Sequence, residues 1–182
     1  QRTVYRMTLV KSYNMDEVEQ YCDLIQEGEP DFIEIKAVTY CGKSDASNLT
    51  MQNVPWHYEV CSYAEAIVHT LNSRSNSRIK YGIATEHEHS CCILIAREDR
   101  FKVNGQWHTW IDYPKFDELI QEYYASNGAK TFTGTDYLAP TPDWALYKSS
   151  ERGFDPKESR YRRTKTGALV EVEYKSSESG CG

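Results

Sequence analysis

The chain has 182 residues, a length typical of one domain. Hydrophobic residues make up 40% of it and charged residues 26%, with a mean hydropathy of −0.69, which excludes mainly disordered and mainly membrane-embedded proteins. With 21 basic and 27 acidic residues the net charge is −6, so binding to nucleic acid requires a local basic patch.

The first half of the chain alternates strand-like and helix-like segments. Asn14, with Glu17 three residues later, has the capping-box pattern of a helix start, and Pro55 suits the first turn of another helix. The expected elements are a strand over 3–11, a helix from Asn14 to Gly28, a strand over 31–40, a helix from Pro55 to Leu71 and two strand segments over 80–96.

This order of elements predicts an α/β fold. Strands that alternate with helices indicate right-handed crossovers and a parallel sheet. The loops after the strands are long and polar, as in α/β barrels, where function lies at the carboxyl ends of the strands. Because so few strands cannot close a barrel, we predict the C-terminal half of a (β/α) TIM-like barrel over residues 1–100. Such a half has an unpaired strand edge, which we expect to be covered or to form a homodimer.

The rest of the chain differs in composition and in its expected elements. Phe116, Leu119, Ile120 and Tyr123 predict one short amphipathic helix. A segment rich in Pro and aromatic residues follows from Phe132, and we expect it to lie extended over the surface, pinned by Tyr137, Leu138 and Trp144. We assign residues 101–175 to a C-terminal region with this helix and extended tail, and 176–182 to a disordered end.

Two charged residues alternate with apolar ones in the second expected strand. If Ile33, Ile35 and Ala37 face the helices, Glu34 and Lys36 point into the barrel. Buried charges are costly unless they are paired, so these two residues are our candidates for contacts to a ligand in the lumen. The alternative is an ion-paired filling of the lumen. Arg6 and Thr8 make the same case more weakly.

The histidines give one candidate metal site. On a strand, His87 and His89 share a face and could chelate a metal ion with Cys91 in reach, although two histidines are an incomplete ligand set. The alternative is a hydrogen-bonded polar turn, so we assign no metal site. No Cys-His pattern stands out, and His57, His69 and His108 are interpreted as helical or surface residues with satisfied hydrogen bonds.

Two segments are candidates for contacts to RNA phosphates. Gly42-Lys43-Ser44 is like the end of a phosphate-binding loop but lacks the upstream glycine, which excludes a P-loop, so Lys43 and Ser44 contact a phosphate or lie in a solvated loop. The one strong basic cluster could bind a phosphate backbone, with one tyrosine for stacking, or be a solvated tail. Its candidate RNA-binding residues are Lys157, Arg160, Tyr161, Arg162, Arg163 and Lys165.

The cysteines, the hydropathy and the first residues predict the setting of the protein. Six cysteines with no C-x-x-C pair are too sparse for a disulfide scaffold and predict reduced thiols in a cytoplasmic or nuclear protein. No apolar run is long enough to span a bilayer, and no membrane partner is expected. Because the sequence starts at Gln1 without an initiator Met or signal-like segment, we expect it to begin inside a longer protein.

Several long strings together resemble the tRNA 4-demethylwyosine synthases, the radical S-adenosylmethionine enzymes of the wyosine and wybutosine pathway. The resemblance covers roughly residues 2–165. It rests on Pro30-Asp31-Phe32-Ile33-Glu34-Ile35-Lys36, Val38-Thr39-Tyr40-Cys41-Gly42, Leu49-Thr50-Met51, Asn53-Val54-Pro55-Trp56-His57, Glu86-His87-Glu88-His89-Ser90-Cys91-Cys92, the stretch from Asp136 to Ala145, and Gly153-Phe154-Asp155-Pro156.

The resemblance implies a radical S-adenosylmethionine barrel that cleaves its cofactor at a 4Fe-4S cluster. The implied reaction is that of a carbon-carbon lyase, which condenses 1-methylguanosine beside the anticodon of phenylalanine tRNA with two carbons from pyruvate. Residues 101–175 would be the wyosine-base-formation region. FMN is implied where a flavodoxin-like domain is fused upstream.

The chain lacks the C-x-x-x-C-x-x-C motif of the family, whose cluster cysteines and pyruvate-binding lysine lie in the N-terminal half. We therefore expect this C-terminal portion to be inactive by itself and to bind no cofactor. Its expected roles are completing the lumen with Glu34 and Lys36 and holding tRNA through Lys43 and the basic cluster. The alternatives are a non-catalytic RNA- or protein-binding module and a metal hydrolase built on His87 and His89.

Overall fold

The computed structural model describes residues 1–43, 47–75 and 78–150, together with the backbone of 160–163 and 169–172. Its longer elements are β1 (Val4–Leu9), α1 (Val18–Gly28), β2 (Phe32–Ala37), α2 (His57–Ser73), β3 (Tyr81–His87), β4 (Cys92–Arg97) and α4 (Tyr113–Ala125). The shorter ones are η1 (Met51–Asn53), η2 (Glu88–Ser90), α3 (Glu98–Phe101), β5 (Lys102–Val103), β6 (Gln106–Trp107), β7 (Trp110–Ile111), β8 (Leu138–Ala139), η3 (Asp143–Ala145), β9 (Arg160–Arg163) and β10 (Leu169–Val172).

The central sheet has four strands in the order β1-β2-β4-β3. β1 and β2 are parallel, whereas β4 is antiparallel to both β2 and β3. The expected all-parallel sheet is therefore wrong at β4. The reason is the short connection between β3 and β4: η2 and Cys91, with φ +46°, reverse the chain directly, and a parallel pair would need a crossover of a dozen or more residues. The described residues form an open mixed α/β sheet and no closed barrel.

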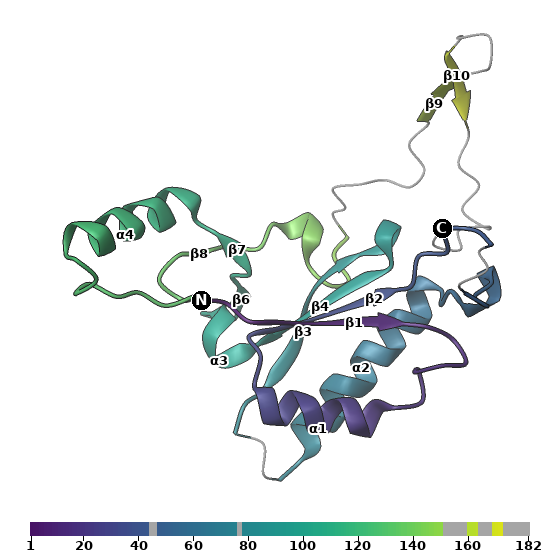
Figure 1. Ribbon diagram of the computed structural model, residues 1–182, viewed down its shortest axis with the longest axis horizontal. Coiled ribbons are helices and arrows are strands. Elements are labelled where there is room, and N and C mark those ends of the chain that lie inside the picture. The colour runs from purple at the N-terminus through teal and green to yellow at the C-terminus, as the bar shows by residue number, and fades with distance from the viewer. Residues whose placement is uncertain (44–46, 76–77, 151–159, 164–168, 173–182) are drawn as a thin grey trace.

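Both long helices of the first half, α1 and α2, cover one face of this sheet (Figure 1). The strands present alternate apolar side chains to them. The core between sheet and helices includes Leu9, Ile33, Ile35, Ile93 and Ile95 from the strands and Ile25, Val60, Ala64, Ile67 and Leu71 from the helices. Burying each Leu or Ile stabilises the fold by about 1.5–3 kcal/mol.

Helix α1 starts later than the capping-box pattern predicted. Val18 is its first residue, because Asn14 is used in a turn: its Oδ1 accepts from the backbone N–H of Val10 at 2.8 Å and its Nδ2 donates to the carbonyl of Thr8 at 2.9 Å. Asn14 thus closes the turn after β1 and does not cap the helix.

The opposite face of the sheet is covered at one end only. Phe32, Ala84, Ala96 and Phe101 form a second small core there, with Leu94, Trp107 and Leu138 packed against it. Gly82 permits the close approach of Trp107, because a Cβ at this position would lie 2.8 Å from the indole ring. Toward the carboxyl ends of β1 and β2, no hydrophobic cluster of the described residues covers this face, which we call the open face.

The C-terminal region folds back along the sheet. Helix α4, capped by Asp112, which accepts from the N–H of Lys115 at 3.0 Å, extends away from the sheet (Figure 1). The segment after it returns through β8, paired with β7, and Leu146 bridges to Thr85 on the outer edge of β3. Of the three expected anchors, Tyr137 is buried, Leu138 is half-buried, and Trp144 is 40% exposed in an edge-on contact with Trp110.

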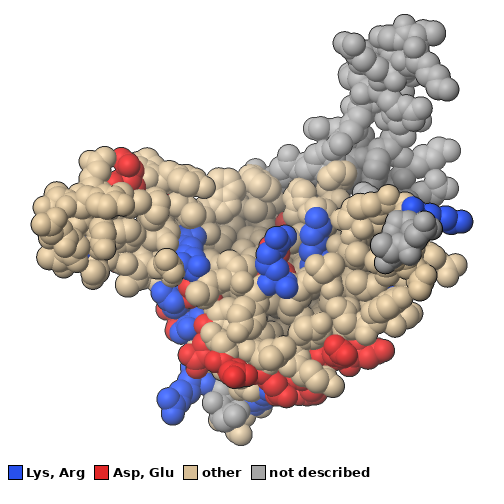
Figure 2. Space-filling view, viewed as in Figure 1, with Lys and Arg blue, Asp and Glu red and all other residues tan. Residues whose placement is uncertain are grey.

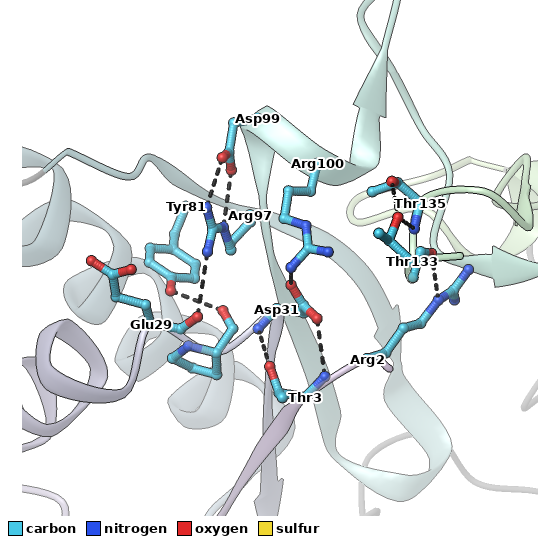
Figure 3. A network of polar contacts seen from close by, with 12 residues as sticks. Arg2, Thr3, Glu29, Asp31, Tyr81, Arg97, Asp99, Arg100, Thr133 and Thr135 are labelled. Atoms are coloured by element: carbon cyan, nitrogen blue, oxygen red, sulfur yellow. Dashed lines mark hydrogen bonds and ion pairs between the residues drawn. The ribbon is translucent and has the colours of Figure 1, made fainter. Parts of the chain in front are cut away.

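A polar network joins this region to the sheet (Figure 3). Asp31, 1% exposed, accepts from the N–H of Thr3 at 3.0 Å and pairs with Arg100. Arg2 donates to four backbone carbonyls, those of Thr109, Trp110, Gly134 and Tyr137, at 2.9–3.2 Å. One side chain therefore ties the start of the chain to two segments more than 100 residues away.

The structure corrects the prediction that all cysteines are reduced. Cys22, Cys41, Cys61 and Cys92 are free, whereas Cys91 is disulfide-bonded, which corrects the expectation of a reduced thiol there. None of the helices that the structure describes has the length and hydrophobicity needed to span a bilayer. The expected disordered end, 176–182, lies outside the described residues.

Candidate functional site

Three strands of the sheet, β1, β2 and β3, run in one direction, so their carboxyl ends lie at the same edge. The loops that follow β1 and β2 meet there, where Lys11 and Asn53 exchange hydrogen bonds. Helix α2 begins at this edge with His57. Function in α/β sheets concentrates at such an edge, and two clusters of polar side chains lie beside it, one on each face of the sheet.

The first cluster is on the open face, where sequence alternation placed Glu34 and Lys36. Ile33 and Ile35 are fully buried against the helices, and Glu34 and Lys36 are half-buried on the other side, as the pattern predicted. Arg6 Nε lies 2.8 Å from Glu34 Oε2. Figure 2 shows basic side chains over the middle of the sheet and acidic ones gathered below, over α1.

This open face offers charges rather than a nucleophile. The side chain of Arg6 is 71% exposed and that of Glu34 is 27% exposed, so their pair adds little to stability and both groups remain available to a polar ligand. Cys92 faces the same side, with its Sγ 3.9 Å from Glu34 Oε1. Burial and the neighbouring Glu34 carboxylate raise the pKa of its thiol to about 11, which keeps Cys92 protonated at neutral pH.

The second cluster lies on the helix side of the same edge. His57 Nε2 is 3.2 Å from Glu86 Oε2 and 3.4 Å from Cys61 Sγ. The three ligand atoms all lie within 4.8 Å of one another. The imidazole of His57 is 17% exposed and the carboxylate of Glu86 is 14% exposed, so the group sits mostly out of water.

Tyr147 and Lys148, which follow η3, contact carboxylates at this second cluster. Glu86 Oε1 accepts from the backbone N–H of Lys148 at 3.0 Å. Glu65 accepts from the hydroxyl of Tyr147 at 2.8 Å and from Lys148 Nζ at 2.9 Å. Burial, together with the carboxylates of Glu86 and Glu65, raises the pKa of the Cys61 thiol to about 11.

The sequence interpretation of the histidines is correct in part at His57, which lies in α2 and has partners at Nε2, but it is wrong about satisfied hydrogen bonds. Nδ1 of His57 is buried and has no hydrogen-bond partner among the described residues, so this is not a satisfied surface histidine. A signal was present in the sequence: His57 and Cys61 are four residues apart in a predicted helix, which places them on one face. Glu86 could not be added without the tertiary structure.

The structure brings His87 and His89 near each other without a third ligand among the described residues. Their rings meet edge to face with centroids 6.2 Å apart, and both residues are exposed. His87 Nδ1 lies 2.6 Å from Ser90 Oγ, within the turn of η2, which is the polar-turn alternative. The expected nearby ligand, Cys91, is fully buried.

The predicted RNA contacts lie mostly outside the described side chains. Lys43 is exposed in the loop after β2, and Ser44 falls outside the described residues. The backbone of Arg160, Tyr161, Arg162 and Arg163 forms β9, paired with β10, and the side chains are not described. Lys157 and Lys165 also fall outside the described residues.

A separate cavity of about 540 Å³ is lined by residues of α4, of the segment that follows it and of the first two positions of the chain. Aromatic side chains dominate its walls, and Arg2 contributes the one charged side chain of the described lining. Its lining is Gln1, Arg2, Phe116, Ile120, Tyr123, Tyr124, Thr131, Phe132 and Tyr137.

Comparison with known proteins gives a specific family match. Residues 27–97 match the family described as wyosine base formation. The chain is 57% identical over 163 residues to the S-adenosyl-L-methionine-dependent tRNA 4-demethylwyosine synthase TYW1 of Xenopus laevis and 56% identical to that of Homo sapiens. Each match covers 90% of this chain and 21% of the relative, so the chain spans about a fifth of these proteins. The resemblance seen in the sequence is thereby confirmed for this segment.

Two solved structures also overlap with the chain. One is a structure of TYW1 with a lysine-pyruvate adduct bound, at 25% identity and a TM-score of 0.43, over 55% of this chain and 28% of that one. The other is archaeal TYW1, at 25% identity and a TM-score of 0.39, over 58% of this chain and 29% of that one.

Proposed function

We propose that this chain is a C-terminal part of a tRNA 4-demethylwyosine synthase and contributes the carboxyl-terminal strands and tRNA contacts of that enzyme. The observation that carries the proposal is the identity of 57% over 90% of the chain. Its parent protein would act as a radical S-adenosylmethionine carbon-carbon lyase in the cytoplasm. It would join N1-methylguanosine of phenylalanine tRNA to two carbons of pyruvate.

The catalytic groups of that reaction would come from elsewhere in the parent. S-adenosylmethionine and 4Fe-4S clusters would supply the radical chemistry, and FMN the electrons where a flavodoxin-like domain is fused. None of the six cysteines of this chain has the C-x-x-x-C-x-x-C spacing of a radical cluster. We therefore propose that the chain alone is inactive and that its own residues position the substrate.

The free edge of the sheet supports a place in a larger barrel. Among the described residues β1 pairs with β2 alone, and Val4 and Tyr5 are 48% and 37% exposed. The other edge, β3, is already covered by Leu146 and Tyr147. We propose that β1 pairs with a preceding strand of the parent, or with a second copy of the chain when it is isolated.

The open face would then be the lumen. Glu34 and Lys36 lie on it near the carboxyl ends of their strands, where barrel enzymes bind substrate. A carboxylate and an ammonium group half-shielded from water can hydrogen-bond the polar edge of a modified guanine or the carboxylate of pyruvate. These residues would act by binding and orientation, because the thiol beside them in the described part of the chain, Cys92, stays protonated at neutral pH.

Nucleoside mass spectrometry of phenylalanine tRNA tests the proposal. Cells that lack the parent gene should lose the tricyclic base and accumulate 1-methylguanosine, and the full-length parent should restore it. Parents with Glu34→Gln or Lys36→Met should restore it poorly, whereas Lys115→Met, on the outer surface of α4, should restore it fully. Normal tricyclic base in cells without the gene would contradict the assignment and favour a non-catalytic binding module.

A further inference from the structure

The cluster of His57, Cys61 and Glu86 has no part in the function proposed above. In the part of the chain that the structure describes, its three side chains place a nitrogen, a sulfur and an oxygen atom within 4.8 Å of one another. We propose that this cluster is a zinc site, with His57 Nε2, Cys61 Sγ and Glu86 Oε2 as its protein ligands.

Two of the three separations between ligand atoms agree closely with tetrahedral zinc. Bonds of about 2.3 Å to sulfur and about 2.0–2.1 Å to nitrogen or oxygen place sulfur about 3.6 Å from nitrogen and nitrogen about 3.3 Å from oxygen. The observed values are 3.4 Å for Cys61 Sγ to His57 Nε2 and 3.2 Å for His57 Nε2 to Glu86 Oε2. Shifts of a few tenths of an ångström bring these two pairs to zinc geometry, and Cys61 Sγ and the Glu86 carboxylate, which lie within 4.8 Å of each other, would draw together around the ion.

The arrangement is not that of a catalytic triad. In a triad the thiol and the carboxylate contact opposite nitrogens of the imidazole. Here both contact Nε2, while Nδ1 is buried without a hydrogen-bond partner among the described residues. A single Nε2 site cannot donate a hydrogen to Glu86 and accept one from Cys61 at the same time. A cation between the three atoms satisfies all of them together.

Three separate segments of the chain hold the ligand side chains in position. Helix α2 fixes His57 and Cys61 one turn apart, and β3 supplies Glu86 from the edge of the sheet. The N–H of Lys148 holds Oε1 of Glu86, which leaves Oε2 to face the cluster. Such outer hydrogen bonds orient the ligands of protein metal sites.

The ligand set favours zinc over a hard cation. Mixed sulfur, nitrogen and oxygen donors suit zinc, whereas magnesium and calcium prefer oxygen alone. On binding, the Cys61 thiol releases its proton to solvent, and the thiolate and the Glu86 carboxylate balance the two charges of the ion. With three protein ligands, a fourth position remains for water or another ligand.

Metal titration of the 182-residue chain tests the site. We expect one zinc ion per chain after gel filtration and a rise in the melting temperature on adding zinc to chelator-treated chain. Cobalt in place of zinc should show thiolate-to-cobalt charge-transfer absorption. His57→Gln and Cys61→Ser should each weaken zinc binding by at least about 100-fold, more than the loss of an outer hydrogen-bond partner causes. Cys61→Ser should also abolish the charge-transfer absorption.

Matched controls separate this site from other thiols and histidines. His69→Gln changes an exposed histidine on the same helix, and Cys41→Ser removes an exposed free thiol, so both should keep one zinc and the absorption. If Cys61→Ser does not fold, Glu86→Gln, which keeps the side-chain shape, should lower zinc affinity. Absence of zinc binding, unchanged affinity in the folded variants, or loss of zinc in His87→Asn instead would overturn the proposal.

Discussion

Arg100 forms an ion pair with Asp31, whose side chain is 1% exposed, and so links α3 to the residue that precedes β2. The other carboxylate oxygen of Asp31 accepts from the N–H of Thr3, before β1. One buried carboxylate therefore holds together the starts of two neighbouring strands and the beginning of the C-terminal region.

We expect Asp31→Asn to lower the free energy of unfolding by about 2–3 kcal/mol, measured by urea denaturation. Both oxygens of Asp31 face donors, and an amide can accept at only one of these positions. The control is Asp99→Asn, which breaks the pair between Arg97 and an aspartate that is 51% exposed and should cost less than about 1 kcal/mol. Equal losses in the two variants would contradict the role given to Asp31.

Arg2 should hold the segment before β8 in place. Its guanidinium donates to the carbonyls of Gly134 and Tyr137 and lies 4.8 Å from the centroid of the Tyr137 ring. A lysine keeps the charge but not the planar fork, so Arg2→Lys should speed amide hydrogen exchange over 133–138. Exchange over β2 should stay unchanged. Identical exchange at 133–138 in both proteins would show that Arg2 is dispensable there.

Thiol reactivity should follow burial. Burial raises the pKa of Cys22, Cys61 and Cys92 to about 11 in each case, so at pH 8 only about one thiol in a thousand is ionised. In chelator-treated chain, exposed Cys41 should be alkylated first, as followed by peptide mass spectrometry. Raising the pH toward 11 should accelerate the half-buried Cys61 and Cys92, because their thiolate fraction grows. Rapid alkylation of Cys61 at neutral pH would contradict its protonated state.

The basic strand β9 should contribute to tRNA binding through phosphate contacts. Replacing Arg160, Arg162 and Arg163 by Glu in the full-length parent should weaken binding and reduce the salt dependence by about one phosphate contact per residue. Arg78→Glu, at an exposed arginine before β3, is the control and should leave the salt slope unchanged. An unaltered slope in the triple variant would remove this strand from the RNA interface.

The placement of Glu34 and Lys36 followed from sequence because the period of a strand is strictly two. Once Ile33 and Ile35 are assigned to the helix side, their neighbours must face the other way. The start of α1 was predicted less well, since the side chain of Asn14 can close a turn or cap a helix, and both use the same atoms. Pattern alone does not choose between two local hydrogen-bonding solutions.

The sequence by itself determined the elements that rest on local periodicity: the four strands of the central sheet, the two long helices of the first half, and the alternation that exposes the polar side of β2. It also carried the strings that identify the relatives. Only the tertiary structure decided that β4 lies between β2 and β3, and that His57, Cys61 and Glu86 meet. Both depend on contacts between segments about 30 to 60 residues apart, whose formation depends on how the whole core packs rather than on local propensity.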